Sequence, residues 1–99
     1  MRTMLKVQVP VEAGNRAIKD GSLPKVIQAA LEELRPEASY FLAEDGKRTM
    51  LLFIDLKETS QIPVTVERFF LELNASVSLI PVMNADELRT GLERASAKR

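Results

Sequence analysis

Apolar and polar residues alternate along the start of the chain, between Thr3 and Val9. One set of alternate positions is fully apolar and the other is mixed: Leu5, Val7 and Val9 against Met4, Lys6 and Gln8. A period of two is typical of a β-strand with one buried side, and Pro10 cannot donate to a strand ladder. The pattern therefore predicts a first strand over residues 3–9.

Helical spacing follows in three segments. Residues 11–21 are ambiguous: one interpretation is a short helical turn from Val11 to Lys19, closed by Gly21, although Gly14 weakens it. A longer helix begins near Ser22, a plausible N-cap, and ends before Pro36, with an apolar stripe formed by Leu23, Val26, Ile27, Ala30, Leu31 and Leu34. A third helix is predicted from Thr59 to about Leu73, with an inward stripe of Ile62, Val66, Phe69, Phe70 and Leu73, and Asn74 is a reasonable stop.

A hairpin is predicted between these helices. Two strand-like segments, 37–44 and 47–56, flank Asp45-Gly46, which is the strongest two-residue hairpin signal. Counting outward from that turn pairs Phe41 with Met50, Tyr40 with Leu51 and Ala38 with Phe53. The segment 50–54 is apolar on both sides, so we expect a central strand that is covered on both faces.

The end of the chain predicts one more strand and one more helix. Residues 76–83 have strand character, and Pro81 restricts that strand to a sheet edge. Asn84 followed by Glu87 three positions later indicates a capping box, before a helix with the narrow apolar stripe Leu88, Leu92 and Ala95. We expect one domain over residues 1–95 and a frayed tail over 96–99.

This order of elements predicts an α+β fold of the ferredoxin-like β-α-β-β-α-β type with a C-terminal helix and a four-stranded antiparallel sheet. Two helices cover only one face of such a sheet. The other face is expected to carry a mixed set: Met4, Lys6, Gln8, Ala38, Tyr40, Leu51, Phe53, Asp55, Ser76, Ser78 and Ile80. Because an exposed apolar patch usually marks an interface, we expect a face-to-face homodimer with a cavity between the sheets. The alternative is that the terminal helix covers part of this face.

Composition restricts the chemistry. The 99 residues carry zero formal net charge, and the chain has no Cys and no His. These facts argue against disorder and against a nucleic-acid partner, and exclude His-based metal sites, thiolate nucleophiles and Ser-His-Asp triads. The longest apolar run, from Met50 to Ile54, is far short of the roughly 20 residues of a membrane span. We therefore expect a cytoplasmic protein with no membrane partner, no metal and no cofactor.

The order of elements and one short segment of the chain resemble those of a known protein superfamily. The order of elements over residues 1–95 is similar to that of the dimeric α/β-barrel superfamily, and the stretch from Glu12 to Gly21 is similar to one in a family of small uncharacterised bacterial proteins. The resemblance is an overall pattern without a diagnostic catalytic motif, so it implies fold more than function. The superfamily includes haem-degrading monooxygenases, cofactor-independent monooxygenases, muconolactone isomerases and His-Asp proteins. The absence of His argues against the first and last of these branches.

The predicted second face holds most of the candidate site residues. Its polar members supply a cation, a phenol, a carboxylate and neutral hydrogen-bonding groups beside the apolar residues Leu51 and Phe53: Lys6, Gln8, Tyr40, Asp55, Ser76 and Ser78. That mixture is typical of a small-ligand pocket. The alternative interpretation is an ordinary cross-strand ion pair between Lys6 and Asp55, with Tyr40 anchoring a dimer.

A second candidate group lies after the first strand. Asn15 and Arg16, together with Lys19, Asp20 and Glu12, are placed where this topology often forms a pocket mouth. Arg16 would attract an anionic substrate and Asn15 would donate to a carbonyl oxygen, unless the segment is simply a solvated helical turn. The charged residues beside the hairpin turn, Lys47 and Arg48, are interpreted as solvent-exposed.

Three functions remain open from the sequence. The first is a homodimer that binds a small organic molecule between its sheets. The second is a cofactor-independent monooxygenase or isomerase acting on a small aromatic or carbonyl compound, with Tyr40 or Asp55 as acid or base. The third is a structural or protein-interaction module without a ligand.

Overall fold

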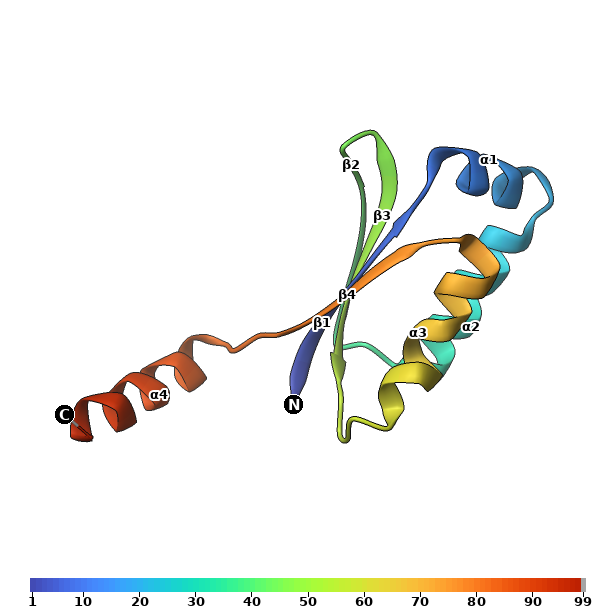
Figure 1. The fold of residues 1–99 in the computed structure, drawn as a ribbon. Coiled ribbons are helices and arrows are strands. Elements are labelled where there is room, and N and C mark those ends of the chain that lie inside the picture. Colours follow the sequence, from blue (N-terminus) through green and yellow to red (C-terminus); the bar gives the residue numbers. More distant parts are fainter. Residues whose placement is uncertain (99) are drawn as a thin grey trace.

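The computed structural model describes residues 1–98 of the chain (Figure 1). Four strands and four helices follow one another in the order β1 (Arg2–Val9), α1 (Val11–Lys19), α2 (Ser22–Leu34), β2 (Ala38–Glu44), β3 (Lys47–Asp55), α3 (Gln61–Leu73), β4 (Ser76–Pro81) and α4 (Ala85–Ala97). This order confirms the predicted sequence of elements, and the segment that the sequence left ambiguous forms the short helix α1.

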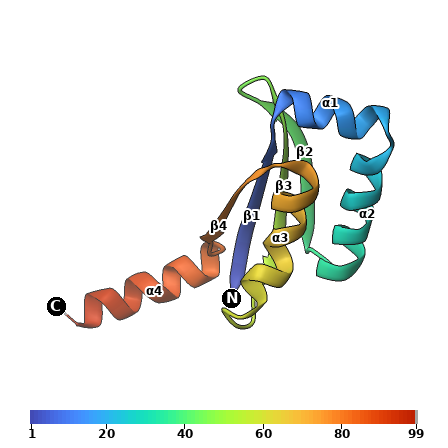
Figure 2. The same ribbon diagram turned by 45° about the vertical axis from the view of Figure 1, so that its right-hand side comes forward.

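The four strands form one antiparallel sheet in the order β2-β3-β1-β4. The two inner strands, β1 and β3, are therefore central, and β4 with its Pro81 lies at an edge, as predicted. Helices α2 and α3 pack side by side against one face of the sheet (Figure 2). The fold is thus the expected ferredoxin-like α+β arrangement.

The hydrophobic core lies between the sheet and these helices. The side chains that are sealed most completely from solvent come from both layers: Leu5, Val7, Leu52, Phe69 and Leu73. Alternation along β1 and β3 places their apolar positions toward the helices. Helix α1 closes one end of this layer through Ala17.

The β2–β3 hairpin has the predicted register. Ala38 pairs with Phe53, Tyr40 with Leu51 and Phe41 with Met50. The turn residues Asp45 and Gly46 have φ values of 54° and 74°. A two-residue turn with positive φ at both positions matches the twist of the flanking strands, and this match fixes the register.

Details of the helices differ from the predictions. Ser22 is the first residue of α2 and not its N-cap; Gly21, with φ 79°, precedes the helix. The Ser22 backbone N–H donates to Asp20 Oδ1 at 2.8 Å, and this hydrogen bonding lowers the pKa of Asp20. On α3, Phe70 was expected to face inward but is 41% exposed, whereas the adjacent Phe69 is fully buried.

Helix α4 stands apart from the core. It begins with the predicted capping box, in which the Asn84 side chain accepts from the Glu87 N–H and the Glu87 side chain accepts from the Asn84 N–H. None of its residues is buried, and it projects from the side of the sheet opposite α2 and α3 (Figure 1). The helix continues to Ala97, and Arg99, the last residue of the expected frayed tail, lies outside the described residues.

The projecting helix gives the molecule an elongated shape. Its longest dimension is 56 Å and its radius of gyration is 16.0 Å. A compact chain of this length has a radius of gyration of about 13 Å. Across residues 1–98, no helix combines the length and the apolar character that a membrane span requires.

Candidate functional site

The open face of the sheet is the first candidate site. We use this name for the predicted mixed set on the side away from α2 and α3: Met4, Lys6, Gln8, Ala38, Tyr40, Leu51, Phe53, Asp55, Ser76, Ser78 and Ile80. The strand registers place these residues on one side of the sheet. Within residues 1–98 no helix covers this face, and α4 points away from it. The sequence predicts that β3 is covered on both faces, but residues 1–98 cover only the face that packs on α2 and α3 (Figure 2).

One half of the open face is polar. The Lys6 ammonium forms an ion pair with Glu44 at the end of β2. Gln8 donates from Nε2 to the Glu44 carbonyl at 3.2 Å and to Thr49 Oγ1 at 3.4 Å. Ser76 and Ser78 on β4 lie opposite Gln8 and Lys6. Four predicted site residues thus occupy one half of the face.

The other half is apolar. Tyr40 and Phe53 meet edge to face, with ring centroids 6.3 Å apart and planes at 82°. Met4 lies between Phe53 and Ile80 in the register of β3, β1 and β4. Tyr40 is nevertheless 60% exposed. This half therefore presents aromatic and aliphatic side chains to the surroundings.

A shallow hollow of about 340 Å³ lies at the apolar end of the open face. Its walls include Tyr40, Phe53 and Met83, and Arg2 and Glu37 border it. The hollow therefore combines an aromatic wall with charged groups at its rim.

The predicted pairing of Lys6 with Asp55 is wrong. Lys6 lies opposite Leu51, and Asp55 lies opposite Arg2 at the far end of the same strands. Asp55 Oδ1 instead accepts a hydrogen bond from the N-terminal amine of Met1 at 2.8 Å, and this interaction lowers the pKa of Asp55. Because the N-terminal amine occupies this carboxylate oxygen, the geometry does not favour Asp55 as a general base.

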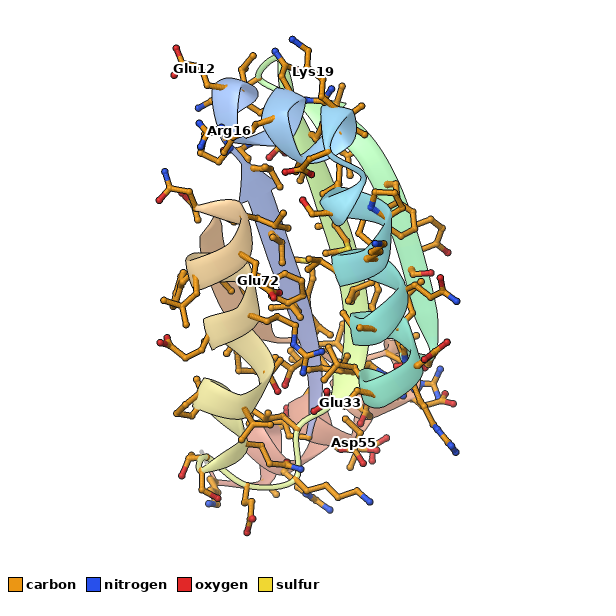
Figure 3. The ribbon with its side chains drawn as sticks, turned by 90° about the vertical axis from the view of Figure 1, so that its right-hand side faces the viewer. Glu12, Arg16, Lys19, Glu33, Asp55 and Glu72 are labelled. Atoms are coloured by element: carbon orange, nitrogen blue, oxygen red, sulfur yellow. The ribbon has the colours of Figure 1, made fainter. Side chains whose placement is uncertain are left out.

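The second predicted group does not join the open face. Arg16 lies on α1 at one end of the molecule, and Asp55 lies at the opposite end (Figure 3). The preceding residue, Asn15, accepts a hydrogen bond from Arg48 Nη1 at 3.0 Å. The predicted site residues are therefore divided between the open face and α1.

A pocket on the helix side was missed from the sequence. It is about 290 Å³ in volume and lies among α1, α2 and the hairpin. Phe41 lines it and is 54% exposed. Arg48, interpreted from the sequence as a solvated turn residue, also lines this pocket. The pairing of Val9 with Arg48 is the signal that places this arginine beside the start of α1.

A charged cluster links the sheet to α4. Arg2 Nε donates to Glu37 Oε1 at 2.6 Å, and Arg2 also forms an ion pair with Glu87. The hydrogen bond from the Asn84 backbone lowers the pKa of Glu87 and keeps this carboxylate available to Arg2. The cluster therefore fixes the start of α4 on the open side of the sheet.

Nothing in residues 1–98 forms a group of three or more acidic side chains placed to hold a metal ion. Comparisons of the chain with protein-family models, with curated proteins and with solved structures found no match.

Proposed function

We propose that the protein is a homodimer in which the open faces of two copies pack together and enclose a small organic molecule. The observation that carries this proposal is that an apolar and aromatic sheet surface is left uncovered by residues 1–98. Contiguous apolar patches on soluble proteins usually mark interfaces, and two-fold pairing of identical patches is the commonest closed symmetry.

The division of the open face into halves supports a ligand-binding role. Packing of the apolar halves excludes water around Tyr40 and Phe53. In the polar half, Lys6 and Gln8 bind Glu44 of the same chain, so the polar groups that border the enclosed space are Arg2 and Glu37 at the rim of the hollow. The hollow beside Phe53 is closed over when a second sheet lies across it. An enclosed apolar space with a few polar groups is the usual composition of a small-molecule site.

Helix α4 supports the homodimer independently. Its 13 residues have no buried side chain, although Leu88 and Leu92 lie one turn apart on the same side. An isolated helix of this length is marginal in water. Helix α4 leaves from the open side of the sheet (Figure 1), which is the side where the proposed second copy lies. In the proposed dimer, Leu88 and Leu92 pack on the partner.

A thermal-shift experiment tests the ligand-binding dimer. The wild-type protein, Tyr40→Asp and a control, Leu71→Asp, are heated with a panel of small aromatic and carbonyl compounds. Tyr40→Asp places carboxylates in the apolar half of the interface, whereas Leu71 is 80% exposed on α3, away from the open face. A compound bound between the sheets raises the unfolding midpoint of the wild type and of Leu71→Asp but not that of Tyr40→Asp. If no compound raises the wild-type midpoint, or if all three proteins respond equally, the proposal is contradicted.

A further inference from the structure

The pocket on the helix side of the sheet has an apolar lining that nothing within residues 1–98 fills. Its apolar walls come from β1, α2, the hairpin and the end of α3: Val9, Leu23, Ile27, Phe41, Met50 and Leu73. Ile18 and Phe41 at its border are each about half exposed. Its volume of about 290 Å³ is close to the lower limit of common ligand pockets. The space therefore suits a small apolar group.

One cation lies in this lining. Arg48 extends from β3, opposite Val9, and its Nη1 donates to Asn15 Oδ1 at 3.0 Å. A guanidinium carries five N–H donors, so this single bond to a neutral amide leaves donors unused. No ion pair among residues 1–98 involves Arg48. The positive charge at the pocket therefore lacks a carboxylate partner from the described chain.

Gly14 allows the guanidinium to occupy this place. A Cβ atom added at Gly14 would lie 2.7 Å from Arg48 Nη1 and 3.4 Å from the Arg48 Cδ. The first of these distances is too short for an undisturbed contact, so any side chain at position 14 displaces the end of Arg48. Asn15 and Gly14 together determine where the charge is held.

We propose that this pocket binds a small carboxylic acid with an apolar body, and that Arg48 holds its carboxylate. The planar guanidinium matches a carboxylate through two parallel N–H···O bonds. The apolar lining accepts the rest of the ligand and removes it from water. This site is separate from the one between the sheets, because it lies on the side of the sheet that α1 and α2 cover.

The surroundings favour a carboxylate over a phosphate. A phosphate dianion is commonly held by several donors or cations, whereas Arg48 is the single cationic side chain lining this pocket within the described residues. Arg16, the next cation along α1, lines a different hollow beside α3. One bidentate cation and an apolar interior are suited to a monovalent acid.

Isothermal titration calorimetry with benzoate and hexanoate tests the proposal, with benzamide and hexanamide as uncharged probes of the same shape. At least one acid is expected to bind the wild type, and its amide about tenfold more weakly. Arg48→Met and Gly14→Ala are each expected to weaken acid binding about tenfold. The control Arg89→Met removes an exposed arginine of α4 and should leave binding unchanged.

The folding of each variant is checked by circular dichroism. Both variants are expected to fold, because alanine favours a helix more than glycine does and because Arg48 is exposed. If one variant does not fold, acid binding by the other variant tests the proposal. Binding of neither acid, equal binding of acid and amide, equally tight binding of inorganic phosphate, or unchanged binding in the folded variants overturns the proposal. Tyr40→Asp, which breaks the proposed dimer, should bind the acid as the wild type does. Loss of acid binding in Tyr40→Asp would overturn the placement in the protomer pocket and favour the open face.

Discussion

The two faces of the sheet are made by the same strands but have opposite surroundings. On the helix side, Leu5, Val7 and Leu52 are sealed by α2 and α3. On the open face, the neighbouring Leu51 and Phe53 are only partly buried, and Tyr40 is mostly exposed. The helix-side face is buried by helices of the same chain. The open face also carries aromatic and aliphatic side chains, but no helix within residues 1–98 covers them. The covered face therefore stabilises the fold, and the open face is the surface on which we propose that two copies assemble.

The largest expected effect on the free energy of unfolding comes from replacing one of two adjacent leucines in β3. Leu52→Ala removes a fully buried side chain and is expected to lower the free energy of unfolding by about 2–5 kcal/mol at every protein concentration. Leu51→Ala is expected to cost about 1 kcal/mol in the monomer, with a further loss at high concentration where the dimer forms. Urea unfolding at two protein concentrations measures both. Equal, concentration-independent losses for the two variants would remove the distinction between the faces.

A chain ending at Met83 tests whether α4 belongs to the assembly on the open side. Removal of a helix without buried residues should leave the protomer folded. The circular dichroism spectrum should lose only the helical signal of the 13 residues of α4. If Leu88 and Leu92 pack on the partner, the dimer should dissociate at a concentration about tenfold higher. Dilution series by light scattering measure this change. An unchanged dissociation constant would show that α4 does not contribute to the interface.

The smallest expected effect concerns the charged end of the open face. The N-terminal amine lowers the pKa of Asp55 from its ordinary value of 3.8, so the interaction stabilises the fold above that value and is lost as the pH falls through the folded-state pKa. Asp55→Asn should therefore lose less stability than the wild type between pH 6 and pH 3 in urea unfolding. Asp45→Asn is the matched control, because Asp45 forms no ion pair within residues 1–98. An acid-side loss in Asp55→Asn as large as that in the control, or larger, would contradict the assigned interaction.

Local signals in the sequence predict most of the fold. Asp45-Gly46 fixes the hairpin register because both residues accept positive φ, and Pro81 marks the edge strand because it lacks an N–H. The capping box at Asn84 marks the start of α4 correctly. The turn, the edge strand and the helix start each depend on the chemistry of residues that are adjacent in the chain, so they can be predicted from the sequence alone.

Contacts between distant elements were harder to predict. Lys6 and Asp55 share a face, but they lie four positions apart in the paired register, and partners for each come from elsewhere in the chain: Glu44 and the N-terminal amine. Phe70 fits the apolar stripe of a helix, but it is partly exposed, because α3 is oriented so that the adjacent Phe69 points into the core. The pocket at Arg48 depends on how α1 folds over the hairpin end, which periodicity does not report.

Sedimentation equilibrium of the wild-type chain, with Tyr40→Asp measured beside it, tests the central claim most directly. We expect a wild-type mass of twice the chain's 11.1 kDa at micromolar concentration, and a mass of one chain for Tyr40→Asp with its fold intact. A wild-type protein that sediments as a stable monomer at that concentration would contradict the account, because the open face would then be exposed to water without a partner.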